Sequence, residues 1–288
     1  MSRSPRVVAI GGGHGTAVTL RAARRYAGEL TAIVSVADDG GSSGRLRDLL
    51  GVPALGDVRN CISALAADDS VLGSALTARY SEGLLSGHAA GNLLLAGLLV
   101  ECGDLELAIA RLGELVGAVG RVLPATTTPT ELRAELVEGQ LVGQAAIART
   151  AAVRGVSVLP EGVRPPTAAL QAIDAAEQIV IGPGSLYTSV LAAAAVPALA
   201  SAIRGAAGRR IYVCNLRPED PETNGYSVAD HVAALTRHGV EIDVVVWDSG
   251  SGLDLGDPQM AVVDSDLRGS NGLVHEPGKL AGVLAGLL

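Results

Sequence analysis

The first unit of the fold can be predicted from residues 7–39, which read VVAIGGGHGTAVTLRAARRYAGELTAIVSVADD. The apolar run at 7–10 is rich in β-branched residues and ends at glycines, which is typical of a buried strand. Helical spacing of Val18, Ala22, Ala23 and Tyr26 follows within residues 16–27, and a second apolar run covers residues 31–37. Strand, glycine loop, helix, strand and acid, in this order, predict a βαβ unit.

The rest of the chain extends this unit into a larger α/β fold. Residues 45–118 predict a nearly continuous helical segment, and period-two alternation around Glu138 and Gly139 predicts a β-hairpin within residues 131–148. From about residue 165 strands alternate with helices again, with strands expected at QIVIG, RIYVCN and DVVVWD. We therefore predict one three-layer, Rossmann-like α/β domain over residues 1–288, with a mostly parallel sheet and helices on both faces.

The composition excludes several classes of partner. The 288 residues are 48% hydrophobic, carry a net charge of −8 and include only 2% aromatic side chains. Nucleic-acid binding needs clustered Lys and Arg or stacking aromatic rings, so we expect no nucleic-acid partner. Cys61, Cys102 and Cys214 show no zinc-type spacing, and the apolar runs are too short for a signal peptide or a bilayer span. These features predict a cytoplasmic protein without membrane insertion.

Glycine-rich loops follow two of the predicted strands, at the edge where open parallel sheets bind ligands. In GGGHGTA, residues 11–17, and GPGSLYTS, residues 182–189, a strand runs through glycines into a helix. Backbone N–H groups at such a helix start can bind phosphate. A tight βα turn or an ordinary helix cap is the alternative that involves no ligand. The candidate phosphate-binding residues here are Gly11, Gly12, Gly13, His14, Gly15, Thr16, Gly182, Gly184, Ser185 and, after the next strand, Asn215.

A third loop, ADDGGSSG at residues 37–44, places acids beside a phosphate-type loop. One acid could hydrogen-bond a ribose, as in NAD-binding proteins, although the loop at 11–16 lacks the third glycine of that fingerprint. Alternatively, an acid could hold Mg²⁺ next to a phosphate. Polar residues at two later helix starts are further candidates, with helix capping as the alternative role. These candidates are Asp38, Asp39, Gly41, Ser42, Ser43, Arg45, Asp57, Arg59, Asn60, His88 and Asn92.

Six segments in order resemble one known family over almost the whole chain. They are VVAIGGGHGTAVTL, AIVSVADDGGSSGRLR, GDVRNCISALA, GHAAGNLLLAGLL, VIGPGSLYTSVL and YVCNLRPEDPETNGYSVADH. Together they are similar to the bacterial gluconeogenesis factors of the YvcK type, within the CofD-like superfamily. His14 stands where this family usually has Thr, whereas ADDGGSSG matches the gluconeogenesis-factor branch and not the transferase branch.

The resemblance implies a regulatory protein that binds a UDP-sugar and supports cell shape and cell-wall homeostasis on gluconeogenic carbon sources, without established turnover. The enzymatic branch, 2-phospho-L-lactate transferase, implies instead a Mg²⁺-dependent transfer on a nucleotide-linked substrate, with Asp39 and Asp57 as candidate metal ligands. NAD binding, from the βαβ unit and its acid, is the third alternative. As partners we expect a UDP-sugar or another nucleotide, proteins of cell-wall synthesis or regulation, and further copies of the chain.

Overall fold

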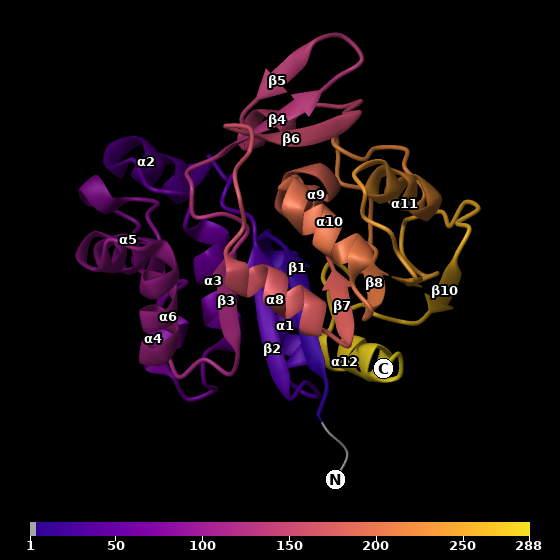
Figure 1. Cartoon of the computed structure of the whole chain (residues 1–288), viewed down its shortest axis with the longest axis horizontal. Helices are drawn as coiled ribbons and strands as arrows, with labels where there is room; N and C mark the ends of the chain where they lie inside the picture. The colour runs from indigo at the N-terminus through magenta and orange to yellow at the C-terminus, as the bar shows by residue number, and fades with distance from the viewer. Residues whose placement is uncertain (1–3) are drawn as a thin grey trace.

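A seven-stranded parallel sheet forms the centre of the protein, whose computed structural model describes residues 4–288 (Figure 1). The strand order is β10-β9-β8-β7-β1-β2-β3, and every neighbouring pair is parallel. This confirms the predicted Rossmann-like α/β class. The strands are β1 (Arg6–Gly11), β2 (Glu29–Val34), β3 (Arg121–Pro124), β7 (Gln178–Ile181), β8 (Arg209–Val213), β9 (Val244–Trp247) and β10 (Ala261–Asp264).

Alternation along β1 sends side chains to two separate cores, one on each face of the sheet. Val8 and Ile10 join the core beneath α8 (Thr167–Ala175), α9 (Leu191–Ala194), α10 (Pro197–Gly205) and α11 (Val228–Arg237). Val7 and Ala9 join the core beneath α1 (Gly13–Ala23), α3 (Gly56–Leu65), α6 (Leu105–Leu115) and α12 (Pro277–Ala285). Because both faces of a parallel sheet are covered, the strands are apolar throughout, which is why they could be recognised as short uninterrupted runs.

The predicted helical segment is present as several helices joined by short turns, with one long interruption. Between residues 45 and 118 the chain forms the end of α2 (Gly41–Leu50), then α3, α4 (Val71–Ala75), α5 (Ala90–Cys102) and α6. Residues 76–89 are mainly irregular, with a short 3-10 helix at Gly83–Leu85 and a bridge between Arg79 and Ala89. This interruption returns the chain so that His88 and Ala89 lie at the start of α5, against α2.

The predicted hairpin belongs to a second, three-stranded antiparallel sheet of order β5-β4-β6, drawn at the top of Figure 1. Its strands are β4 (Glu131–Glu135), β5 (Gln140–Val142) and β6 (Gly155–Leu159). The strand prediction is wrong beyond Val142, because Gly143 turns the chain at φ 108° into the short helix α7 (Gln144–Ile147). Strands β3, β6 and β10 were not predicted, since each is short and lies outside the clear α/β alternation.

The order of the strands defines where a ligand should bind. From β1 the chain builds outward to β2 and β3 on one side, and then returns to β7 on the other side of β1. This reversal is the topological switch point of the sheet, and open parallel sheets bind ligands outside the carboxyl ends of the strands at that point. The loops that follow β1 and β7 are GGGHG and GPGS, the two glycine loops singled out from the sequence.

Within residues 4–288, no single helix has the length and apolar character needed to cross a bilayer. One helix pair, Leu186–Ala194 with Pro197–Gly205, meets those criteria only when taken together, and it bends by 79° at its break.

Candidate functional site

The loop after β1 presents backbone N–H groups at the start of α1. The helix begins at Gly13, and its N-cap residue, Gly12, provides no side-chain cap. Gly13 adopts φ 64°, a left-handed conformation that favours glycine. The Thr16 hydroxyl donates to the Gly12 carbonyl at 3.0 Å and is fully buried, so it shapes the loop and does not face solvent. His14, by contrast, is exposed at the helix start.

The two glycine loops are in direct contact. A Cβ at Gly15 would collide with the Pro183 carbonyl oxygen, and the Thr19 hydroxyl donates to the Gly182 carbonyl at 2.6 Å. Asn215, at the end of β8, fixes the second loop by accepting from Gly184 N–H at 2.9 Å and donating to the Gly184 carbonyl at 3.0 Å. The structure therefore joins three predicted segments, after β1, β7 and β8, into one surface.

Two glutamates that the sequence did not single out anchor the second loop. Glu222 is buried, accepts from Tyr187 N–H at 2.7 Å and from the Thr188 hydroxyl at 2.7 Å, and so caps the helical turn at Leu186–Val190. Burial raises the pKa of Glu222. Glu219 accepts from the Ser185 hydroxyl at 2.8 Å, so this candidate hydroxyl is held within the loop. Both acids lie in NLRPEDPETN, which follows β8 directly, and that position was the available signal.

Asp38 and Asp57 form a carboxylate pair beside the first glycine loop. Gly56, which precedes Asp57 at the start of α3, lies close to Asp38, since a Cβ there would be 3.4 Å from Asp38 Oδ2. Burial, reinforced by the Asp38 charge and opposed by the Gly13 backbone and Arg59, raises the pKa of Asp57 to about 7. Burial also raises the pKa of Asp38, against hydrogen bonds from Gly40 and Ser43. Two carboxyls that each disfavour ionisation are typical of a cation or shared-proton site.

Asp39 faces another part of the molecule. Its Oδ1 accepts from the Ala145 N–H at 2.7 Å, in the first turn of α7, and a Cβ at Gly143 would be 2.7 Å from its Oδ2. Asp39 therefore ties the loop after β2 to the small antiparallel sheet. The predicted metal pair of Asp39 and Asp57 stays a prediction, whereas the carboxylate whose charge acts on Asp57 is that of Asp38.

A buried polar network supports the loop after β2 from below. The Ser42 hydroxyl lies 3.1 Å from His88 Nδ1 and accepts from Asn92 Nδ2 at 3.0 Å. Asn92 Oδ1 in turn accepts from Arg59 Nε at 3.1 Å, and Arg59 also donates to Asn60. Burial and the Arg45 charge lower the pKa of His88, which favours the neutral ring. The network joins α2, α3 and α5.

The other candidate residues near this network mainly contact neighbouring parts of the protein. Arg45 is exposed and donates to the Ser86 carbonyl at 2.9 Å, which holds the loop before α5. Gly41 is exposed, with open space around the position of a Cβ. Gly11 lies beneath the loop, where a Cβ would be 2.6 Å from the Thr16 hydroxyl. Ser43 lies against Gly56 and the Asp38 carboxylate, so it borders the acid pair.

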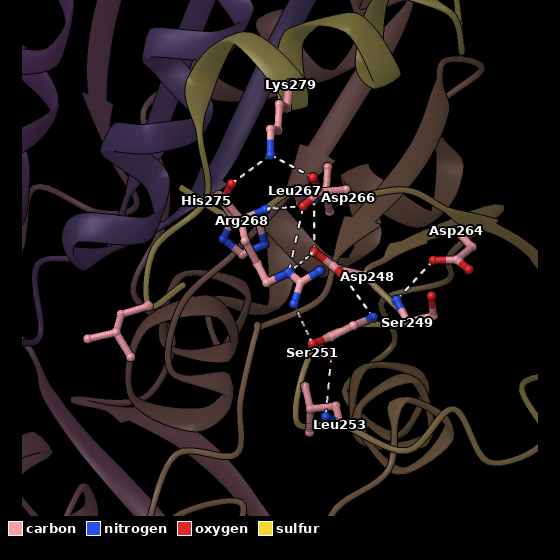
Figure 2. Close-up of polar contacts among 12 residues, drawn as sticks. Asp248, Ser249, Ser251, Leu253, Asp264, Asp266, Leu267, Arg268, His275 and Lys279 are labelled. Carbon is pink, nitrogen blue, oxygen red and sulfur yellow. Dashed lines mark hydrogen bonds and ion pairs between the residues drawn. The ribbon is translucent and has the colours of Figure 1, made fainter. Parts of the chain in front are cut away.

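A cavity of about 250 Å³ opens beside the glycine loops. His14, Gly184, Asn215 and Glu219 line one side of this cavity, and the segment from Leu273 to His275 lines the other. Figure 2 shows how that segment is held. Buried Asp248 accepts from Arg268 Nε at 3.1 Å and from Leu267 N–H at 2.9 Å, next to His275 in this view.

Lys279, in α12, also holds this segment in place. Its Nζ donates to Asp266 at 2.7 Å and to the Arg268 carbonyl at 2.9 Å (Figure 2). His275 Nε2 lies 3.1 Å from the Cys214 carbonyl, and burial lowers the pKa of His275 to about 4. The neutral His275 ring therefore donates to the Cys214 carbonyl just after β8, which holds the lining segment 273–275 in place.

Within residues 4–288, no group of three or more His, Cys, Asp and Glu side chains forms a complete metal site. Mg²⁺ does not need one, since it keeps several waters and is held through one or two carboxylates with substrate phosphates. Asp38 and Asp57, beside the phosphate-type loop, fit that requirement. The ion would reduce the repulsion between these carboxylates and an anionic ligand.

Comparisons with known proteins define the class. The sequence profile of the family described as 2-phospho-L-lactate transferase CofD matches residues 7–261. The chain thus belongs to the CofD family. A crystal structure of a UPF0052-family protein from Bacillus halodurans superimposes with a TM-score of 0.93 at 32% identity, covering 99% of this chain and 100% of that chain.

Within this class the chain is a gluconeogenesis factor-type protein, as its sequence relatives show. It is 40% identical to the gluconeogenesis factor of Halalkalibacterium halodurans, over 85% of this chain and 78% of the relative. It is 38% identical to that of Bacillus subtilis, over 83% of this chain and 76% of the relative. The match with a Nostoc relative, at 43% identity, spans 81% of this chain but only 52% of that protein. The resemblance read from the six motifs is confirmed.

Proposed function

We propose that the protein is a regulatory protein that binds a UDP-activated sugar at the carboxyl edge of its sheet and couples growth on gluconeogenic carbon to cell shape and cell-wall homeostasis. The observation that carries the binding role is the contact between the GGGHG and GPGS loops at the switch point. There, the N–H groups at the start of α1 face the edge where a diphosphate would lie, beside the Asp57 carboxylate that the Gly13 N–H contacts.

The cavity beside these loops supports the assignment of a nucleotide-linked ligand. The diphosphate would lie over the first glycine loop, while His14 and Asn215 border a space of about 250 Å³ suited to part of the attached group. Backbone amides and the helix dipole neutralise part of the charge. The identification of that group as a UDP-sugar rests on the kinship with gluconeogenesis factors.

A Mg²⁺-dependent transferase is the second candidate, and the Asp38–Asp57 pair favours it. In this case the ion would be held by these two carboxylates, and the chain would contribute positioning and charge stabilisation at the departing phosphate. Asp57 can carry a proton near neutral pH, so it can also exchange one with the substrate. Kinship with a transferase family is consistent with this alternative.

Calorimetry separates these functions from the NAD alternative. UDP-N-acetylglucosamine, GDP and NAD⁺ are titrated into the full chain with Mg²⁺ and with EDTA. Binding of the UDP-sugar alone, unchanged by EDTA, is expected for the regulatory function. Binding of GDP only with Mg²⁺ would support the transferase, and binding of NAD⁺ alone would contradict both. A deletion strain that grows with normal shape on gluconeogenic carbon would contradict the regulatory role.

A further inference from the structure

A second cavity lies away from the glycine loops, between α1, α3, α4 and the start of α12. It measures about 760 Å³. The walls contain three arginines from one stretch of chain at the end of α1 and several hydroxyl side chains from the opposite side. These arginines and hydroxyl residues include Arg21, Arg24, Arg25, Ser63, Ser74 and Thr77.

The three arginines come together because of helical spacing. Arg21 lies in the last turn of α1, and the C-cap residue Arg24 and then Arg25 follow three and four residues later, so that the turn beyond the helix brings them to the same side. Arg24 has structural partners, since its Nη1 donates to the Ala66 carbonyl at 3.1 Å and lies 3.2 Å from Asp68. Arg24 therefore fixes the end of α3 and forms part of the wall.

Arg21 and Arg25 have no such partners. Within residues 4–288, neither guanidinium makes a side-chain hydrogen bond or an ion pair. Both arginines are exposed. Asp68 is the single acid among the described residues that line the cavity, and Arg24 already neutralises it. Glu276 lies near Arg25 but outside the lining, and its carboxylate accepts from Lys279 N–H. Among the described residues, the cavity therefore carries a net positive charge: Arg21 has no acidic partner, and the Glu276 charge offsets Arg25 only from outside the lining.

We propose that this cavity binds a small, multiply charged anion of the phosphate-ester or diphosphate class. Guanidinium groups bind phosphate oxygens through two parallel hydrogen bonds, and two of them on the same side can bind one phosphate group together. The volume is that of a metabolite site. As an alternative role, the arginines could only interact with the negative end of the dipole of α1, but that interaction would need no cavity.

The site is separate from the proposed nucleotide edge. The glycine loop lies at the start of α1 and the arginines at its end, roughly 16 Å apart along the helix axis. Both sites therefore share one rigid element. An anion bound at the end of α1 could affect ligand binding at its start only through this helix or its contacts.

Inorganic pyrophosphate and glucose 6-phosphate are suitable probes for the full chain. Titrations are run with EDTA and saturating UDP-N-acetylglucosamine, which occupies the glycine loops if it binds there. If it does not bind, any binding of the probe at the glycine loops is fitted as a second, separate site. The double variant Arg21→Gln/Arg25→Gln is expected to bind the probes at least about tenfold more weakly. The matched control, Arg154→Gln/Arg164→Gln, removes the same charge from exposed arginines and is expected to bind as wild type does.

A direct readout locates the anion. Phenylglyoxal modification of Arg21 and Arg25, followed by mass spectrometry, is expected to slow in the presence of pyrophosphate, with Arg164 unaffected. Equal weakening in both double variants would overturn the site, because a general charge effect would then explain the binding. Unprotected Arg21 and Arg25 would also overturn it. A phosphoserine peptide binding tenfold more tightly than either probe would overturn the assignment to a small molecule. None of these outcomes depends on whether UDP-N-acetylglucosamine binds.

Discussion

The Asp57 carboxylate lies directly against the backbone of Gly12, where a Cβ would be 2.6 Å from Asp57 Oδ2. The glycine loop and the acid of α3 therefore share one surface, and no side chain fits between them. The backbone of Gly12 is extended at φ −161°, a conformation open to any residue, so the constraint comes from space alone.

Gly12→Ala is expected to displace Asp57 and weaken nucleotide binding by about tenfold or more, because the added methyl enters the space of the carboxylate. Isothermal titration with UDP-N-acetylglucosamine measures this loss. Gly97→Ala is the matched control, since a Cβ at that position in α5 meets no atom within 4 Å. Equal affinity in the two variants would show that the ligand does not approach Gly12.

Substitution of the acids one at a time tests which of them holds a metal ion. Asp38→Asn and Asp57→Asn are each expected to weaken Mg²⁺ binding by at least about tenfold, because each removes a carboxylate ligand from an ion that prefers charged oxygens. Asp39→Ala is expected to leave Mg²⁺ affinity unchanged and to cost about 1 kcal/mol of stability, since it removes the bond to Ala145 N–H. Weakened Mg²⁺ binding in Asp39→Ala and Asp57→Asn, with Asp38→Asn unchanged, would instead support the predicted pair of Asp39 and Asp57.

The raised pKa of Asp57 makes stability depend on pH. Its folded-state pKa is about 7, against about 3.9 in an unfolded chain. The folded state therefore binds the extra proton between these values, and stability falls as pH rises from about 4 to 7 and stays low above that.

Asp57→Asn removes this penalty. Relative to the wild type, the variant is expected to gain about 2 kcal/mol more at pH 8 than at pH 4.5. Urea unfolding at both pH values measures the difference, and the exposed Asp69→Asn provides the control. A parallel pH dependence in wild type and Asp57→Asn would contradict the assignment.

Arg268 is expected to hold the wall of the 250 Å³ cavity. Arg268→Ala leaves Asp248 buried with only backbone donors, so we expect a loss of about 1–2 kcal/mol and weaker ligand binding as the segment 268–275 loosens. Lys279→Ala, which removes an exposed contact to the same segment, is expected to change both quantities little. Urea unfolding and ligand titration check both variants, and unchanged affinity in Arg268→Ala would show that this wall does not contact the ligand.

The local sequence pattern was sufficient to predict the helices and strands that have a clear hydrophobic period or an uninterrupted apolar run. Strand β1, the glycine loop and α1 could be placed from residues 7–27, because buried parallel strands are short apolar runs and glycine marks the turn. Strand β10 could not be recognised, since only four residues of an otherwise polar stretch pair with β9. Helix α7 replaced an expected strand end because its first turn depends on Asp39, more than 100 residues earlier in the chain.

The candidate site divides in the same way. The sequence by itself determined which loops follow the carboxyl ends of the strands, and kinship of the motifs determined the family, because both depend on residue types in order. Only the tertiary structure decided that Asp38 and not Asp39 acts on Asp57, that Ser42, His88, Asn92 and Arg59 form one network, and that Glu222 caps the second loop. These relationships join residues on different elements, and their distances depend on how the helices pack on the sheet.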